Sequence, residues 1–331
     1  MGWKTVAAMV VSLTAASTTT AVAAEVPQWQ VTLLPMPADS PNAGVWLYGA
    51  DGHGGYAGTI TNAAGWAVAT WRDGEVAVHD GPDGHDFPEV RGESWDGTVL
   101  VDSVTLDRAG VYHPVSLGSF SAAAPFVIGP RGDLVGLGTD PESSERDALY
   151  WPSPDAEPVV LAGMLPNSYP VAIDDDGTVL FRHPDGPYLL RDGVVEQLAL
   201  PAGYTVGTAY AIRHGVVTGS AWPPQGSTGG AGLVWRSPDC PQVLANSAYT
   251  TLTRNSHGLS AGTEPAPDSD LFYGAGAAWR HGQRLGRLPA LDGLPAVHPR
   301  FVDEDGTIAG VASGPGMSDD GRPALWRLVS G

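Results

Sequence analysis

Residues 171–198 read VAIDDDGTVLFRHPDGPYLLRDGVVEQL, and this stretch holds the unit that is repeated along the chain. Four short runs rich in aliphatic residues are separated by turn residues, which include the pairs Asp176-Gly177 and Asp192-Gly193. Asp-Gly pairs supply the positive φ angles that tight hairpins need, and β-branched residues suit a pleated, half-buried strand. The stretch therefore predicts four antiparallel strands joined mostly by tight turns.

The same plan recurs seven times between residue 45 and the end of the chain. The glycines of the first turn in each repeat are Gly52, Gly97, Gly132, Gly177, Gly215, Gly258 and Gly306. Strand-only repeats of roughly 40–50 residues are typical of propeller blades. The sequence predicts an all-β, seven-bladed β-propeller with four-stranded blades, as a single domain over residues 25–331. The repeat around Gly97 is weak, which leaves six blades with an irregular insertion as the alternative.

The two ends of the repeat array complement each other. The last repeat reaches a third strand at Leu325–Leu328, with too little sequence after it for a fourth, whereas residues 29–34 resemble an unpaired fourth strand. Pairing these segments would remove the two exposed edges of an open array. We expect the N-terminal strand to close the ring.

A tryptophan recurs at the end of the third strand in five repeats, namely Trp71, Trp151, Trp235, Trp279 and Trp326. A ring of this size buries about 150–250 Å² when it packs between neighbouring blades. The alternative is a set of exposed platforms for sugar stacking. Because each tryptophan lies in an apolar strand beside a tight turn, we expect it to pack between blades.

The N-terminus has the order of features found in an export signal. Lys4 supplies positive charge, residues 6–13 are apolar, and Ala21-Val22-Ala23 offers a small-residue cleavage site. The apolar run is shorter than the 18 or more residues that a membrane span requires. We expect residues 1–24 to be removed and the protein to be secreted.

The chain is strongly acidic, with a formal net charge of −19, one unit more negative once Lys4 is removed. Such a surface disfavours nucleic acids and anionic membranes, which need clustered cations. Cys240 is the only cysteine, so an intrachain disulfide is excluded. The Asp-rich turns at 174–177 and 303–306 lack the spacing and terminal Glu of an EF-hand. We expect no cofactor and no bound metal, with a metal site assembled across blades as the alternative. We also expect a monomer.

Three repeats carry a more specific signature. Gly132–Gly136 with Ala148–Trp151, Gly215–Gly219 with Gly232–Trp235, and Gly306–Gly310 with Ala324–Trp326 resemble the extracellular HAF-repeat proteins of bacteria. Their units resemble Asn-Asp-x-Gly-x-Val-Val-Gly followed by His-Ala-Phe-x-Trp. No repeat here keeps the His-Ala-Phe triplet. The resemblance implies an exported β-propeller and supplies no catalytic residues.

In a four-stranded blade, the turns between the first and second and between the third and fourth strands share one face. The loops between the second and third strands lie on the other face and are long in several repeats, as binding loops on a rigid scaffold often are. We expect this face to bind an extracellular protein or polysaccharide without catalysis, and the alternative is a carbohydrate-active enzyme, a glycosidase or polysaccharide lyase, at the mouth of the channel. No catalytic residue is assigned. The candidate ligand-binding residues are Tyr169, Arg182, His183, Tyr204, Trp222, Tyr249, Phe272, Tyr273, His298 and Arg300.

Overall fold

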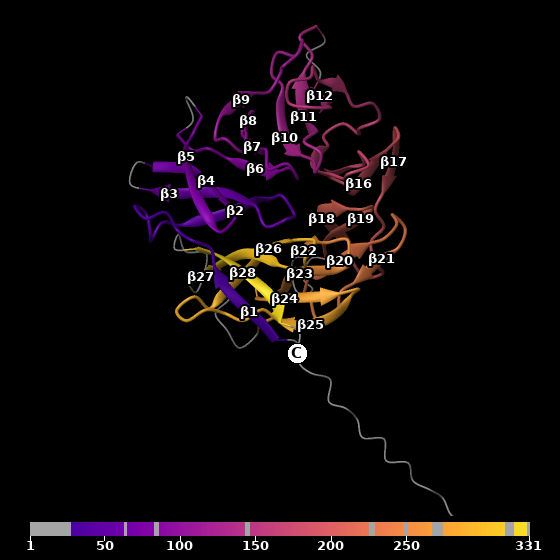
Figure 1. Cartoon of the computed structure of the whole chain (residues 1–331). Coiled ribbons are helices and arrows are strands. Elements are labelled where there is room, and N and C mark those ends of the chain that lie inside the picture. Colours follow the sequence, from indigo (N-terminus) through magenta and orange to yellow (C-terminus); the bar gives the residue numbers. More distant parts are fainter. Residues whose placement is uncertain are drawn as a thin grey trace, which may run out of the picture.

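The computed structural model describes residues 28–62, 65–82, 86–142, 146–224, 229–247, 251–266, 274–314 and 321–329. Every regular element in these ranges is a β-strand, and the strands form seven antiparallel sheets of four (Figure 1). No helix in the described ranges is long and apolar enough to cross a bilayer. The fold is therefore all-β, as the sequence predicts.

Each sheet is one blade, with its strands called a to d from the inside outward. Blade 1 consists of β2 Val45–Ala50, β3 Tyr56–Asn62, β4 Gly65–Arg72 and β5 Glu75–Asp80, and blade 2 of β6 Val90–Glu93, β7 Val99–Val101, β8 Val104–Leu106 and β9 Tyr112–Pro114. Blade 3 consists of β10 Ala124–Ile128, β11 Leu134–Thr139, β12 Arg146–Trp151 and β13 Val159–Val160. Blade 4 consists of β14 Tyr169–Ile173, β15 Val179–His183, β16 Gly186–Arg191 and β17 Val194–Gln197. Blade 5 consists of β18 Val206–Arg213, β19 Val216–Trp222, β20 Ala231–Trp235 and β21 Pro241–Val243. Blade 6 consists of β22 Thr251–Arg254, β23 Leu259–Glu264, β24 Ala275–Arg280 and β25 Gln283–Arg287. Blade 7 consists of β26 Ala296–Val302, β27 Ile308–Ser313, β28 Arg322–Val329 and β1 Gln28–Leu33.

The seven blades stand around a central axis. The first strands β2, β6, β10, β14, β18, β22 and β26 contact one another in this order, and β26 contacts β2 to complete the circle. The weak second repeat forms a full blade, β6 to β9. The protein is thus a seven-bladed β-propeller, and the six-bladed alternative is wrong.

The N-terminal strand closes the ring. β1 is the outermost strand of blade 7 and pairs antiparallel with β28, from Gln28 opposite Val329 to Leu33 opposite Ala324. In Figure 1 the indigo β1 lies beside the yellow β28. Because β26 and β27 come from the end of the chain and β1 from its beginning, one sheet ties both ends together. This confirms the predicted closure.

Turn glycines set the a–b hairpins. All seven predicted turn glycines have φ between +73° and +87°, in the left-handed region that favours glycine. In blade 4 the amide of Gly177 donates to the Asp174 carbonyl, and the amide of Asp174 donates to the Thr178 carbonyl. These local bonds explain why the repeat is readable from the sequence.

The five recurring tryptophans join neighbouring blades. Each is at most 1% exposed, and each indole Nε1 donates to a backbone carbonyl just after strand d of the preceding blade, at 2.6–2.9 Å. Trp235, for example, donates to the carbonyl of Ala199, which follows β17. The packing interpretation is confirmed, and the platform alternative is wrong. Leu106 and Leu190 take the equivalent position in blades 2 and 4.

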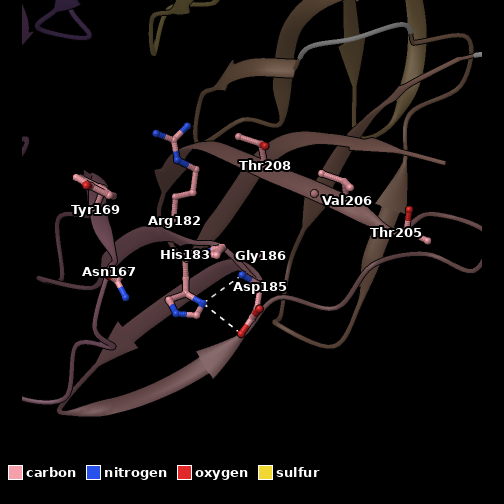
Figure 2. A pocket seen from close by; sticks show the side chains of 11 residues that line it. Asn167, Tyr169, Arg182, His183, Asp185, Gly186, Thr205, Val206 and Thr208 are labelled. Atoms are coloured by element: carbon pink, nitrogen blue, oxygen red, sulfur yellow. Dashed lines mark hydrogen bonds and ion pairs between the residues drawn. The ribbon is translucent and has the colours of Figure 1, made fainter. Parts of the chain in front are cut away.

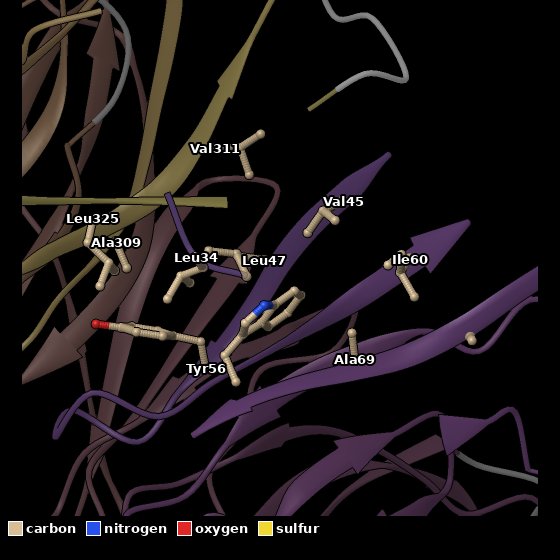
Figure 3. Close-up of a cluster of buried hydrophobic side chains, with 11 residues drawn as sticks. Leu34, Val45, Leu47, Tyr56, Ile60, Ala69, Ala309, Val311 and Leu325 are labelled. Atoms are coloured by element: carbon tan, nitrogen blue, oxygen red, sulfur yellow. The ribbon is translucent and has the colours of Figure 1, made fainter. Parts of the chain in front are cut away.

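Apolar side chains fill the space between adjacent blades. Figure 3 shows one such cluster, in which Leu47 and Ile60 of blade 1 meet Ala309 and Leu325 of blade 7. Leu34, directly after β1, belongs to the same cluster. The core is therefore a series of layers between blades, which holds the inner strands in fixed positions around the axis.

A β-bulge recurs in strand a of every blade. The register shifts by one residue three positions before the first residue of the a–b turn, and the bulged residues are Tyr48, Arg91, Phe126, Val171, Tyr210, Leu252 and Arg300. In five blades a glycine of strand b lies opposite the residue just before the bulge, as Gly136 lies opposite Pro125. Bulges bend a strand and re-aim a side chain. The seven bulged residues form a ring at one level of the axis.

Candidate functional site

The loops divide between the two faces as predicted. The a–b and c–d connections lie on one face, and the b–c connections lie on the other. Four b–c connections are long and join β11 to β12, β19 to β20, β23 to β24 and β27 to β28, whereas the other three are tight. The second face therefore carries most of the variable surface.

Side chains from several blades meet over the axis on the a–b face. Arg213 of blade 5 donates through Nε and Nη2 to Oε1 of Glu304 in blade 7, at 3.1 and 2.8 Å. The same guanidinium lies over the ring of Trp95 in blade 2, 5.2 Å from its centroid. The amide of Glu304 donates to the carbonyl of Gly52 in blade 1. These contacts bridge the axis, so we expect a ligand to approach from the b–c face.

On the b–c face, a cavity of about 350 Å³ opens between blades 4 and 5 (Figure 2). It is lined by Asn167, Tyr169, residues 182–186 and residues 205–208. Tyr169 begins β14 and lies opposite Arg182 at the end of β15, so strand pairing itself brings these two side chains together. Tyr169 is 45% exposed. The cavity thus combines an open aromatic ring with charged and hydroxyl groups.

His183 is held in place at the edge of this cavity. Its Nδ1 accepts the backbone N–H of Asp185 at 3.2 Å and lies 3.5 Å from Asp185 Oδ2, as the dashed lines in Figure 2 show. Its ring meets the edge of Tyr188, with ring centroids 5.7 Å apart. These contacts fix the imidazole beside the tight turn of β15 and β16, where it can hydrogen-bond a ligand.

A second cavity of about 520 Å³ adjoins the first, between blades 3 and 4. Both cavities are lined by Asn167 and Tyr169, and the second adds Arg146 from β12. The Arg146 guanidinium lies 5.6 Å from the centroid of the Tyr169 ring. Together they form a groove, called the blade 3–5 groove below, in which one tyrosine stands between two arginines.

The predicted site residues fall into four groups. Tyr169, Arg182 and His183 line the blade 3–5 groove. Trp222 ends β19 opposite Val206 of the groove wall, and Tyr204 packs partly buried against the core. His298 and Arg300 lie in β26 at the axis, where burial lowers the pKa of each. Tyr249, Phe272 and Tyr273 lie outside the described residues.

Sequence reasoning missed part of this arrangement. Asn167, Thr205 and Thr208 belong to the groove, although as single polar residues near strand starts they carry no motif. The bulged residues Tyr48 and Arg91 were also missed, and here a signal exists, since each stands three positions before an a–b turn. Within the described ranges, no group of three or more His, Cys, Asp or Glu is placed to hold a metal ion.

Comparison with known proteins supports the propeller fold but identifies no family and no activity. No known protein family matches the chain, and no curated protein does. Among solved structures it is similar to virginiamycin B lyase from Staphylococcus aureus, with a TM-score of 0.58, 14% identity, and coverage of 92% of this chain and 100% of that one. It is also similar to the β-propeller domain of the Trilobed protease from Pyrococcus furiosus, with a TM-score of 0.55, 10% identity, and coverage of 87% and 96%.

A prolyl endopeptidase is similar as well, with a TM-score of 0.54 and 13% identity, over 88% of this chain and 51% of that protein. This chain therefore spans about half the length of the peptidase. The Pyrococcus domain is described as having an open velcro topology, whereas β1 and β28 pair here. A lyase and two peptidases on one architecture show that the fold alone does not determine the activity.

Proposed function

We propose that this chain is a secreted, non-catalytic propeller that binds an extracellular polysaccharide or protein through its b–c face. The blade 3–5 groove is the observation that carries the proposal. The degenerate HAF-like repeats and the N-terminal export signal support a place outside the cell.

The chemistry of the groove suits a sugar chain in particular. The exposed ring of Tyr169 offers a flat apolar surface, while Arg146 and Arg182 offer planar sets of N–H donors. Within the described residues, neither guanidinium lies within 4.0 Å of a carboxylate. Their donors can therefore bond hydroxyl or acidic groups of a ligand. Asn167 and Thr208 add neutral hydrogen-bonding groups.

The position of the perturbed carboxylates favours binding over glycoside hydrolysis. Burial raises the pKa of Glu93 to about 7 and that of Asp303 to about 7. A raised pKa is what a general acid needs. Both residues, however, lie at a–b turns, on the face opposite the groove. They bond Arg72 and Tyr56 there, so their role is structural.

A glycan array and an extracellular-protein pull-down with the secreted form test the proposal. Tyr169→Ala and Arg182→Ala should each weaken binding at least tenfold, since one well-placed contact residue contributes about 1.4 kcal/mol or more. Arg280→Ala is the matched control, because Arg280 is exposed at the c–d turn on the opposite face. Binding unaffected by the groove variants would place the site elsewhere. Release of sugar products from a bound glycan would contradict a non-catalytic role.

A further inference from the structure

The ring of bulged residues places two arginines and two aromatic side chains next to one another at the axis. Blades 7, 1, 2 and 3 contribute Arg300, Tyr48, Arg91 and Phe126 in order around the ring. The Arg91 guanidinium lies 5.2 Å from the centroid of the Phe126 ring. Burial raises the pKa of Tyr48, and the neighbouring Arg300 charge opposes this shift. These four side chains are called the axial cluster below.

The axial cluster is open to solvent on one side. Tyr48 is 41% exposed although it lies in an innermost strand. On the a–b face the axis is bridged by Arg213, Glu304 and Trp95, as described above. Because these contacts lie over the axis on the a–b face, we infer that a ligand reaches the axial cluster from the b–c face.

The two arginines of the axial cluster have unused N–H donors. Within the described residues, no carboxylate lies within 4.0 Å of the Arg300 guanidinium. Arg91 donates from Nη2 to Glu89 Oε2 at 2.8 Å, but its buried Nε has no acceptor in the described part of the chain. A buried donor without an acceptor is unfavourable by about 1–3 kcal/mol. Arg300 is thus placed to bond an added anionic oxygen, and the charge of Arg91 favours an anion beside it.

We propose that the axial cluster is a binding site for a single carboxylate group carried on a sugar ring. Arg300 takes the carboxylate in a charge-assisted hydrogen bond, and the Arg91 guanidinium adds positive charge beside it. Tyr48 and Phe126 present apolar ring surface on either side of Arg91, against which the sugar ring packs. The site lies apart from the blade 3–5 groove and is expected to bind whether or not the groove is occupied.

The local charge selects a monoanion. Arg300 and Arg91 contribute two positive charges, and Glu89 contributes one negative charge beside Arg91. The resulting single positive charge balances one carboxylate. A phosphate dianion would remain partly uncompensated and close to Glu89, in a protein whose overall charge is −19. The uronate class is therefore preferred to sugar phosphates.

Calorimetric titration of the secreted form with galacturonate tests this site, with methyl galactoside as the neutral match and inorganic phosphate as the competing anion. Galacturonate should bind, methyl galactoside should bind at least tenfold more weakly, and phosphate no more tightly than galacturonate. Arg300→Gln should weaken galacturonate binding at least tenfold. Arg300→Lys, which keeps the charge, should retain more of the binding than Arg300→Gln. Arg91→Gln gives a second, independent loss.

Two controls separate this site from the groove and from the general surface. Arg280→Gln, at an exposed position on the opposite face, should bind galacturonate as the unmodified protein does, and Tyr169→Ala tests the groove as the competing site. The melting temperature of each variant verifies its fold. The proposal is overturned if galacturonate gives no binding, if Arg300→Gln and Arg91→Gln bind it unchanged, or if methyl galactoside or phosphate binds more tightly. Loss of binding in Tyr169→Ala alone would assign the carboxylate to the groove and likewise overturn the axial site.

Discussion

Replacing Gly136 with alanine should destabilise the protein more than any open-surface change, because this glycine makes room for the bulge of blade 3. A Cβ at Gly136 would lie 2.6 Å from Pro125 Cα and still closer to the carbonyl oxygen of Ala124. Real Cβ atoms essentially never approach within 3.0 Å. Both neighbours are backbone atoms of the inner strand β10, which is packed between blades. The strand can relieve the clash only by moving away from β11.

The expected cost is about 3 kcal/mol, at the upper end of the 1–3 kcal/mol that overpacking usually costs, because backbone yields less than a side chain. In a domain of this size that corresponds to a fall in melting temperature of roughly 6 °C. Differential scanning calorimetry and urea unfolding of the secreted form measure it. Because β10 has to move away from β11, the packing around Phe126, the bulged residue of β10, should also change.

Gly92→Ala is the control. The φ of Gly92 lies outside the left-handed region, and its added Cβ would press on the Cγ2 methyl of Ile128 at 3.0 Å and only touch the Ile128 carbonyl oxygen at 3.9 Å, so a side chain rather than the backbone has to give way. It should lower the melting temperature by less than half as much. Equal melting temperatures for Gly136→Ala and the unmodified protein would refute the link between this glycine and the bulge.

Three further predictions concern stability. Trp235→Leu should lower the free energy of unfolding, measured in urea, by about 3 kcal/mol, because it removes the buried ring and its hydrogen bond to the Ala199 carbonyl. The variant should still fold, because leucine fills this position in two blades, and failure to fold would contradict this. Burial raises the pKa of Glu93 and of Asp303 to about 7, well above their values in the unfolded chain, so the protonated forms stabilise the fold; as the pH rises from about 4 to 7, stability should fall by up to about 3 kcal/mol for Glu93 and about 4 kcal/mol for Asp303. Glu93→Gln should flatten the dependence of unfolding free energy on pH, and an unchanged slope would refute this. Deleting residues 25–36 removes β1 and should abolish cooperative thermal unfolding, whereas a truncated protein that melts like the full one would disprove closure by β1.

Much of the fold is readable from local sequence because its signals are local. Gly177 has to adopt positive φ within its own hairpin, and the backbone groups of Asp174 bond Gly177 and Thr178 of the same turn, so each a–b turn is visible in isolation. Repetition of this signal at a blade-sized interval then gives the number of blades. The last repeat has no fourth strand after Leu328, and residues 29–34 resemble a fourth strand without a blade of their own. Together these two features indicate how the ring closes.

The site is a different matter, because its residues come together only through packing between blades. Tyr169 and Arg182 are neighbours by strand pairing, but Arg146 joins them from blade 3 and Thr208 from blade 5. No pattern along the chain indicates that Arg213 reaches across the axis to Glu304, 91 residues away.

The sequence by itself determined the architecture, since hairpin turns, strand composition and repeat length are properties of short segments. Only the tertiary structure decided which side chains share a surface, because closing the ring fixes the spacing and rotation of all seven blades at once. The ring of bulges shows both effects. Its residues occur at a regular place in each repeat, yet Arg300 and Tyr48 become neighbours only when the last blade meets the first.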